Sequence, residues 1–234
     1  MENICFVVNK YPNEFEPYML VFLQQLAWEF ADMGKKVTVI CPLPVNLNRK
    51  YLQIPYHTRE YTEKKKSIDI YWPKTAGLGQ SHYVLGRSPV GITTFFLEKA
   101  AERVIRSFTE KPDVIYGHFM APSGIAVARL SDTFKIPAFF ALGESHNTIE
   151  QFGAERAKEE LKDIAGVIAV STYLKRWIVD AGVLEVGKPA DITVFSTTEE
   201  WTVDRNKFYT KGKVSPFDGM TVTGKAKLTV VDGK

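Results

Sequence analysis

The chain has 234 residues, with 45% hydrophobic and 24% charged side chains and a formal net charge of +3. These values are typical of a globular protein with one large domain, or with one medium domain and an appendage. So small an excess of basic residues tolerates anionic ligands but does not indicate a nucleic-acid-binding protein. No run of 18 apolar residues occurs, which argues against a membrane-spanning helix.

Cys5 and Cys41 are the two cysteines, and both stand in apolar runs that are typical of buried strands. Two isolated thiols of this kind predict reduced core residues rather than a disulfide framework. The first residues enter a strand directly, so no signal peptide is expected and a cytoplasmic location is favoured. No residue pattern indicates a cofactor.

Strand-like and helix-like segments alternate along the chain as far as Gly182. The expected strands are short and rich in β-branched residues, and the expected helices carry apolar residues three and four apart. Gly34 is expected to end the first helix, and Ser171 or Thr172 to cap the last. The expected strands are 3–8, 35–42, 68–73, 112–118, 136–142 and 165–171, and the expected helices are 23–30, 93–108, 123–134, 155–162 and 173–182.

This alternation predicts an α/β fold, a Rossmann-like parallel sheet with helices on both faces. Ligands bind such sheets at the carboxyl ends of the strands, near helix N-termini. Asn9–Pro17, Gly117–Gly124 and Gly143–Asn147 follow expected strands and are therefore expected at that edge. Tyr18 and Met19 are expected in the core rather than on a membrane-facing surface.

The pattern changes after residue 183. Runs 190–195, 201–204 and 221–233 have strand composition, turn-rich pieces separate them, and no helical period is present. The sequence therefore predicts a first domain of residues 1–183 and a short all-β tail of residues 184–234. Because few large apolar residues offset the entropy of ordering the tail, we expect a loosely packed hairpin or a flexible segment, and less readily self-association through its edge strands.

The first part resembles the N-terminal, acceptor-side domain of a GT-B glycosyltransferase of the retaining family four. The resemblance rests on "NKYPNEFEPYMLVFLQQLAWEFADMGKKVTVICP", "PDVIYGHFMAPSGIAVARL", "IPAFFALGESHN" and "IAGVIAVSTYLKRWIVDAG". In this family a histidine, a short spacer, Pro-x-Gly and a helix follow one another, and here these are His118, Pro122 and Gly124. A short glycine-containing loop follows the next strand, and here it is residues 143–146.

The resemblance implies transfer of a sugar from a nucleotide-sugar to a glycan or lipid-linked acceptor in envelope polysaccharide synthesis. It also implies a cytoplasmic protein that associates peripherally with the inner membrane face. In such enzymes the N-terminal domain mainly holds the acceptor, and a second domain holds the nucleotide-sugar. That donor domain is expected after residue 183, where this chain changes its pattern, so the resemblance implies a truncated enzyme with little activity alone.

The tail resembles the C-terminal segment of a dihydroorotase-type amidohydrolase. The matching runs are "EVGKPADITVF", "EEWTVDRNKFYTKGK", "SPFDGM" and "GKAKLTVVDGK". In those enzymes a barrel supplies the metal ligands, and this chain has no His-x-His pair. Its histidines, which are scattered singly, are His57, His82, His118 and His146. No metal site is therefore expected, and the chain is interpreted as a fusion of two fragments.

The resemblance to glycosyltransferases implies that acceptor-binding residues lie in the strand-end loops. The candidates are Tyr11, Asn13, His118, Gly143, Glu144, Ser145 and His146. Each has a structural alternative: ordinary loop residues for Tyr11 and Asn13, a packed turn residue for His118, and helix capping for the loop at 144–146. A catalytic pair of neighbouring residues at 145 and 146 is not favoured, because sequence neighbours rarely have the geometry of a triad. Catalytic residues are left unassigned.

Three hypotheses follow for the whole chain. The first is an incomplete glycosyltransferase, which needs a donor domain before it can use a nucleotide-sugar. The second is a protein related to dihydroorotase that acts in pyrimidine synthesis, as its tail suggests. The third is a non-catalytic binding module, completed by a separate partner. Nucleic acid is not an expected ligand of any of them.

Overall fold

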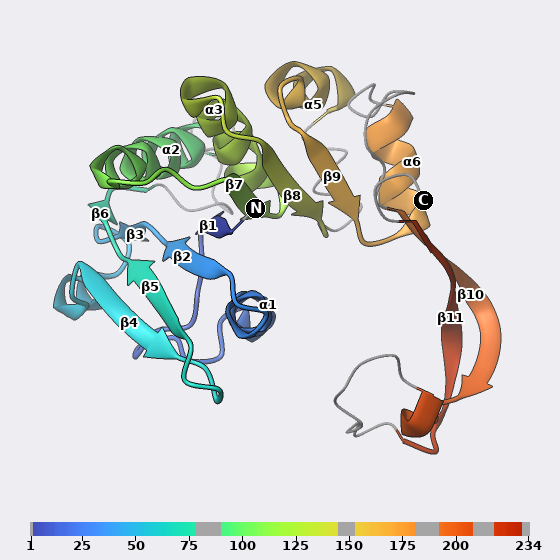
Figure 1. Cartoon of the computed structure of the whole chain (residues 1–234). Coiled ribbons are helices and arrows are strands. Elements are labelled where there is room, and N and C mark those ends of the chain that lie inside the picture. The colour runs from blue at the N-terminus through green and yellow to red at the C-terminus, as the bar shows by residue number, and fades with distance from the viewer. Residues whose placement is uncertain (1, 78–89, 145–152, 181–191, 208–217, 231–234) are drawn as a thin grey trace. The chain divides into compact units, whose positions relative to one another are not determined.

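The computed structural model describes residues 2–77, 90–144, 153–180, 192–207 and 218–230 (Figure 1). The chain divides into two compact units, Met1–Lys188 and Pro189–Lys234. The first unit contains the described α-helices of the chain, and the second contains two long strands. Each unit is described by itself below.

A seven-stranded sheet forms the centre of the first unit, in the order β4-β5-β2-β1-β7-β8-β9. All neighbouring strands run parallel except the edge strand β4, which runs antiparallel to β5. The bounds of the strands are Asn3–Val7 for β1, Lys36–Ile40 for β2, His57–Tyr61 for β4, Ser67–Tyr71 for β5, Val114–His118 for β7, Ala138–Leu142 for β8 and Gly166–Ala169 for β9. The predicted α/β fold with a parallel sheet is confirmed.

The order of the strands reverses between β1 and β7. From β1 the chain moves outward to β2 and β5, then crosses back to β7 and continues to β8 and β9. This is the doubly wound order in which ligand crevices form outside the carboxyl ends of the strands, beside the point of reversal. A separate small parallel pair, β3 (Leu43–Pro44) with β6 (Lys74–Thr75), lies past the ends of β2 and β5.

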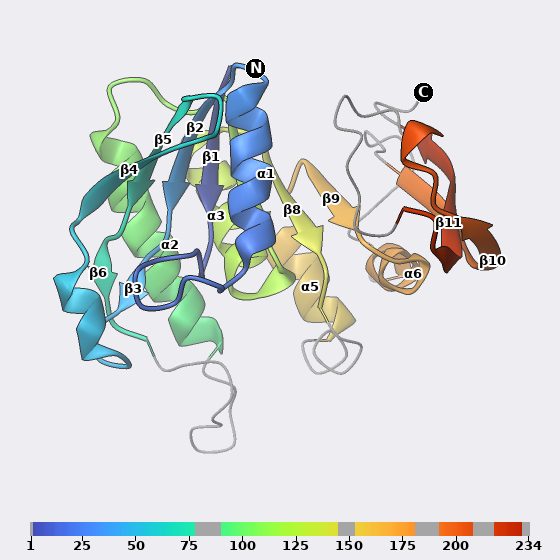
Figure 2. The ribbon, with the colours of Figure 1, turned by 90° about the horizontal axis from the view of Figure 1, so that it is seen from below.

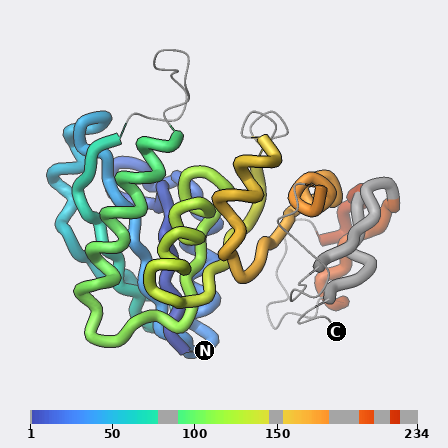
Figure 3. Tube along the Cα trace, turned by 90° about the horizontal axis from the view of Figure 1, so that it is seen from above, coloured from blue at the N-terminus to red at the C-terminus, as the bar shows by residue number. Residues whose placement is uncertain are grey.

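Helices cover both faces of the sheet. Helix α1 (Val21–Asp32) lies on one face, in front of the strands in Figure 2. Helices α2 (Val90–Ser107), α3 (Ile125–Phe134) and α5 (Ala154–Leu161) lie on the other face, toward the viewer in Figure 3. Helix α6 (Thr172–Asp180) follows β9. Two short helical segments are η1 (Arg49–Gln53) and η2 (Met120–Gly124), of which η2 runs directly into α3.

The alternation of side chains along β1 produces two hydrophobic clusters, one on each face of the sheet. Cys5 and Val7 belong to the cluster under α2 and α3, whereas Ile4, Phe6 and Val8 belong to the cluster under α1. This is the period of two that a strand imposes on its side chains. Both faces are apolar because both are covered, which is the usual condition of a parallel strand.

The sequence signals at the cysteines and at two helix ends are confirmed. Cys5 and Cys41 are free and buried, and burial raises the pKa of the Cys41 thiol to about 12. Gly34 has a φ of +86° directly after α1, in the left-handed region that favours glycine at a helix C-terminus. The Ser171 hydroxyl accepts a hydrogen bond of 3.2 Å from the backbone N–H of Leu174 and so caps α6.

The second unit is an antiparallel pair of strands, β10 (Ile192–Thr202) and β11 (Thr221–Val230). Their pairing contains register shifts near 194–195 and 196–200. A single 3₁₀ turn, η3 (Arg205–Lys207), follows β10. The short all-β tail is confirmed, although the runs expected as strands at 190–195 and 201–204 belong largely to the one long strand β10.

Within the part of the chain that the structure describes, no helix is both long enough and apolar enough to cross a membrane.

Candidate functional site

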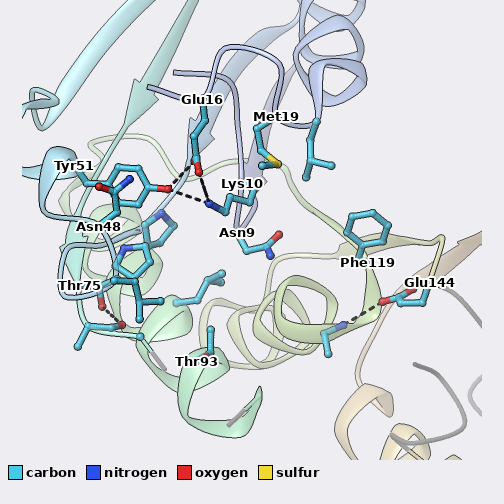
Figure 4. Close-up of a pocket in the computed structure, with 18 of the residues that line it drawn as sticks. Asn9, Lys10, Glu16, Met19, Asn48, Tyr51, Thr75, Thr93, Phe119 and Glu144 are labelled. Carbon is cyan, nitrogen blue, oxygen red and sulfur yellow. Dashed lines mark hydrogen bonds and ion pairs between the residues drawn. The ribbon is translucent and has the colours of Figure 1, made fainter. Parts of the chain in front are cut away.

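A pocket of about 820 Å³ opens at the carboxyl edge of the first unit's sheet (Figure 4). Its walls come from segments that are far apart in sequence. Asn9 and Lys10 follow β1, Phe119 and Ala121 follow β7, and residues 143–144 follow β8. The three segments that the strand alternation places at this edge therefore each contribute to one pocket. It lies beside the point where the strand order reverses, as expected for a doubly wound sheet.

One wall carries a closed polar network of Lys10, Glu16 and Tyr51 (Figure 4). The Lys10 ammonium lies 3.1 and 3.0 Å from the two carboxylate oxygens of Glu16 and donates a hydrogen bond of 3.0 Å to the Tyr51 hydroxyl. The Tyr51 hydroxyl in turn donates a bond of 2.6 Å to Glu16 Oε2. The network joins the end of β1, the loop before α1 and the segment η1.

The network stabilises the charged forms of Lys10 and Glu16 and the neutral form of Tyr51. Burial alone would lower the pKa of Lys10, but the hydrogen bonds to Tyr51 and Glu16 outweigh it, and the pKa is raised. Burial would likewise raise the pKa of Glu16, but the donors Tyr51 and Lys10 hold it below its ordinary value. Burial and the neighbouring carboxylate raise the pKa of Tyr51. At neutral pH the network is an ion pair with a neutral phenol.

The opposite wall is built around a strained turn that a half-buried carboxylate holds. Phe119 has a φ of +67°, a region that non-glycine residues rarely adopt. The backbone N–H groups of the next two residues, Met120 and Ala121, both donate to Glu144 Oε1. Gly143 donates its backbone N–H to Glu144 Oε2 at 3.1 Å. Glu144 thereby ties the end of β8 to the turn after β7.

Two opposing influences act on the pKa of the Glu144 carboxyl group. Burial raises its pKa, although the backbone N–H donors oppose that shift by stabilising the carboxylate. Glu144 and Gly143 both line the pocket, whereas the other described candidates do not. That they contact an acceptor remains a prediction.

Tyr11 and Asn13 do not line the pocket; they build the loop beside it. Tyr11 is fully buried, and its hydroxyl donates a bond of 2.6 Å to Glu60. The Asn13 side-chain oxygen accepts from the backbone N–H groups of Phe15 and Glu16 at 3.0 and 3.1 Å. This turn directs Glu16 toward Lys10. The expected contacts of Tyr11 and Asn13 with an acceptor stay predictions, and the contacts described here are structural.

His118 also lies outside the pocket lining. Its Nδ1 is hydrogen-bonded to the Tyr116 hydroxyl at 2.9 Å, and its ring packs against the rings of Phe22 and Phe119 at centroid distances of 4.8 and 4.5 Å. Burial lowers its pKa to about 4, so the ring is neutral at physiological pH. Its role as an acceptor ligand stays a prediction. Ser145 and His146 lie outside the described residues.

Sequence reasoning missed several residues of the pocket. Lys10 and Glu16 line the pocket and lie inside a segment expected at the ligand edge, whereas the acceptor contacts expected from that segment are Tyr11 and Asn13. Position after a strand is a signal for this edge, but it does not say which neighbouring side chain faces the pocket. Tyr51 comes from the irregular region after β2, where no sequence pattern indicated a site.

The dihydroorotase resemblance of the C-terminal segment is confirmed by comparison with known proteins. The dihydroorotase of Geotalea daltonii is 46% identical to this chain over 56 residues, which are 24% of this chain and 13% of that enzyme. No family model matches the chain.

The glycosyltransferase resemblance is confirmed as well. TuaC of Bacillus subtilis, a provisionally assigned teichuronic acid biosynthesis glycosyltransferase, is 27% identical over 202 residues. The match covers 79% of this chain and 49% of TuaC, so this chain spans about half the length of that relative.

Solved structures show only a distant likeness. The UDP complex of UGT89C1 from Arabidopsis thaliana has a TM-score of 0.42 and 12% identity, over 76% of this chain and 48% of that one. A TM-score of this size supports no inference about fold or function. The fold class therefore rests on the strand order and on the layers of helices described above.

Proposed function

We propose that the first unit is the acceptor-side lobe of a GT-B glycosyltransferase of family four. The family activity is transfer of a sugar from a nucleotide-sugar to a glycan or lipid-linked acceptor. The observation that carries the proposal is the pocket at the carboxyl edge of the sheet, beside the reversal of strand order between β1 and β7. Similarity to TuaC over most of the chain supports the reaction class.

The proposed division of labour makes residues 1–183 the acceptor domain and residues 184–234 a foreign segment. In a two-lobed enzyme the nucleotide-sugar binds the second lobe, which stabilises the charge that develops on the leaving diphosphate. The described residues after 191 form an antiparallel ribbon rather than a nucleotide-binding lobe. We therefore expect little or no sugar transfer by residues 1–234 unless a donor lobe is supplied.

The cellular setting forms part of the same proposal. A lipid-linked acceptor would favour a cytoplasmic protein that associates peripherally with the inner membrane face. Self-association through the edges of the ribbon is a further, weaker expectation, because unpaired strand edges can template pairing with another chain. Co-purification with a donor-lobe protein would support a partner that completes the enzyme.

The test combines binding with turnover. We expect the chain to bind simple methyl glycosides, with binding measured by chemical-shift titration. We also expect it to give no product with a panel of nucleotide-sugars. Ala76→Trp places a large ring at the exposed Ala76 in the pocket wall and should abolish binding. Ala154→Trp, at an exposed position on α5, is the matched control. Absence of glycoside binding would refute the acceptor lobe, and efficient transfer by the chain alone would refute the need for a second lobe.

A second candidate function comes from the tail. The 46% identity to a dihydroorotase favours a protein related to pyrimidine synthesis. In the described residues, however, no group of three His, Cys, Asp or Glu side chains could hold a metal ion. Stoichiometric zinc together with cyclisation of carbamoyl-aspartate would establish this alternative in place of sugar transfer.

A further inference from the structure

The polar wall of the pocket is almost neutral in charge. Among the described lining residues Lys10 is the basic one, and Glu16 and Glu144 are the acidic ones. Lys10 is paired with both oxygens of Glu16, so its charge is compensated within the wall. The lining therefore carries a net charge of zero when Glu144 is protonated and of −1 when it is ionised. Neither state attracts an anion.

The Lys10–Glu16–Tyr51 network is also short of free hydrogen-bond donors. An ammonium group has three N–H donors, and Lys10 directs bonds to Glu16 Oε1, Glu16 Oε2 and the Tyr51 hydroxyl. The single proton of the Tyr51 hydroxyl is donated to Glu16. The acceptors have capacity to spare, because the Glu16 carboxylate and the Tyr51 oxygen have more lone pairs than these bonds use. The network thus offers acceptors to a ligand.

Asn9 adds a carboxamide at the same place, whose oxygen is a third acceptor and whose nitrogen carries two N–H donors. It follows β1, lines the pocket and lies between Lys10 and Phe119 in Figure 4. Its side-chain oxygen is buried and has no hydrogen-bond partner among the described residues. A buried acceptor without a partner costs free energy, which a ligand that brings an O–H or N–H group would recover. Phosphate dianions and carboxylates bring acceptors only.

We propose that Asn9, Lys10, Glu16 and Tyr51 form a specificity subsite for a neutral, hydroxyl-rich sugar group and discriminate against phosphorylated and uronic acid groups. The proposal rests on the proposed acceptor lobe and names the class of group that this part of it takes. Hydroxyls donate to the free acceptors of the network, and the apolar lining residues Met19, Leu20, Leu97 and Phe119 pack against the C–H faces of a sugar ring. Exclusion of anions comes from Glu16, which cancels the charge of Lys10.

The experiment compares probes that differ in one group on the full chain. Neutral methyl glycosides are paired with the matching methyl uronides, and inorganic phosphate is added as a third probe. Affinities come from chemical-shift titrations in which the signals of pocket residues are followed. We expect the neutral member to bind about tenfold or more tightly than its charged counterpart.

Three variants test which residues make the pocket prefer neutral over charged probes. Glu16→Gln leaves the Lys10 charge uncompensated and should raise the affinity for uronides about tenfold, with a smaller change for neutral glycosides. Tyr51→Phe should weaken neutral binding by about three- to tenfold and keep the preference, because the ion pair remains. Glu29→Gln, the same isosteric change at an exposed position of α1, is the control and should change neither.

The outcomes separate this inference from the proposed function. Binding of uronides or phosphate as tight as that of the neutral probes, or a preference unchanged by Glu16→Gln, overturns the neutral subsite and leaves the acceptor lobe standing. Binding of none of the probes overturns both. A neutral preference that Glu16→Gln removes supports both.

Discussion

The two units of the chain differ in what their sequences can bury. The C-terminal segment that includes the second unit has the higher identity to a known relative, 46% over 56 residues against 27% over 202 residues. Yet among its residues whose exposure the structure describes, 199–207 and 218–223, Val203 alone is buried. The first unit buries side chains on both faces of its sheet. Similarity preserves a strand pattern, but a core needs an opposing layer to pack against.

The largest effect should come from one truncation made in each unit. Phe140 on β8 is fully buried, so Phe140→Ala should lower the free energy of unfolding by about 3–5 kcal/mol. Val203→Ala removes two methyl groups from a site outside both hydrophobic clusters. It should leave the free energy of unfolding of the first unit within about 0.5 kcal/mol of wild type. Denaturant unfolding followed by the helical circular dichroism signal measures both. Equal losses would contradict the contrast between the units.

The tight packing around the pocket turn predicts the next largest effect. A Cβ added at Gly124 would lie 2.9 Å from the carbonyl oxygen of Phe119 and 2.9 Å from the Phe140 ring, so Gly124→Ala should cost about 1–3 kcal/mol. Gly91 in α2 is the control, since its added Cβ would lie 3.6 Å from the end of Arg156. Gly91→Ala should be neutral or stabilise the unit by about 0.5–1 kcal/mol. A stability loss of the same size in both would remove the steric explanation.

His118 predicts a smaller, pH-dependent effect in the first unit. Burial lowers its pKa from 6.5 to about 4, so between these values the unfolded chain binds the proton more readily than the folded one. Stability should therefore fall as the pH falls from 6.5 to 4. Because the ring is partly exposed, we expect about 1–2 kcal/mol rather than the full shift.

The comparison with His118→Gln isolates this contribution from other titrating groups. The free energy of unfolding is measured for wild type and for the variant at pH 7 and at pH 4. The contribution of His118 is the change, between the two pH values, in the difference between wild type and variant. The variant should lose less stability on acidification than wild type. A difference that does not change with pH would mean that His118 titrates normally in the folded protein.

The order of helices and strands in the first unit could be predicted because helices cover both faces of its sheet. Apolar runs such as Ile4–Val8 and Phe139–Leu142 stand out against polar helix faces, and they alternate with amphipathic segments. Strand β4 was missed for the opposite reason. It lies at the sheet edge, and its residues, HTREY, are exposed or half-exposed and mostly polar. Tyr18 and Met19 were expected in the core, but both are exposed, Tyr18 to 89%, because they precede α1 in a loop.

The location of the pocket could be predicted more fully than its residues. The doubly wound topology brings three strand ends to one edge, and that follows from the order of strands and helices alone. The order of strands and helices does not tell which of Lys10 and Tyr11 faces the pocket, because side chains that are neighbours in sequence point in different directions. Tyr51 lies 41 residues after Lys10, and only the folded chain brings its hydroxyl to the ammonium group.

The smallest expected effect is that of removing residues 189–234. Both hydrophobic clusters of the first unit consist of residues up to 178, and all seven strands of its sheet end before residue 170. The free energy of unfolding of the shortened chain, followed by the helical circular dichroism signal, should therefore lie within about 0.5 kcal/mol of that of the full chain. It should also keep the glycoside affinities of the pocket, whose described lining residues run from Asn9 to Glu144. A loss of several kcal/mol would show that the tail has become part of the first unit's folding, and the two-fragment interpretation would then fail on physical grounds.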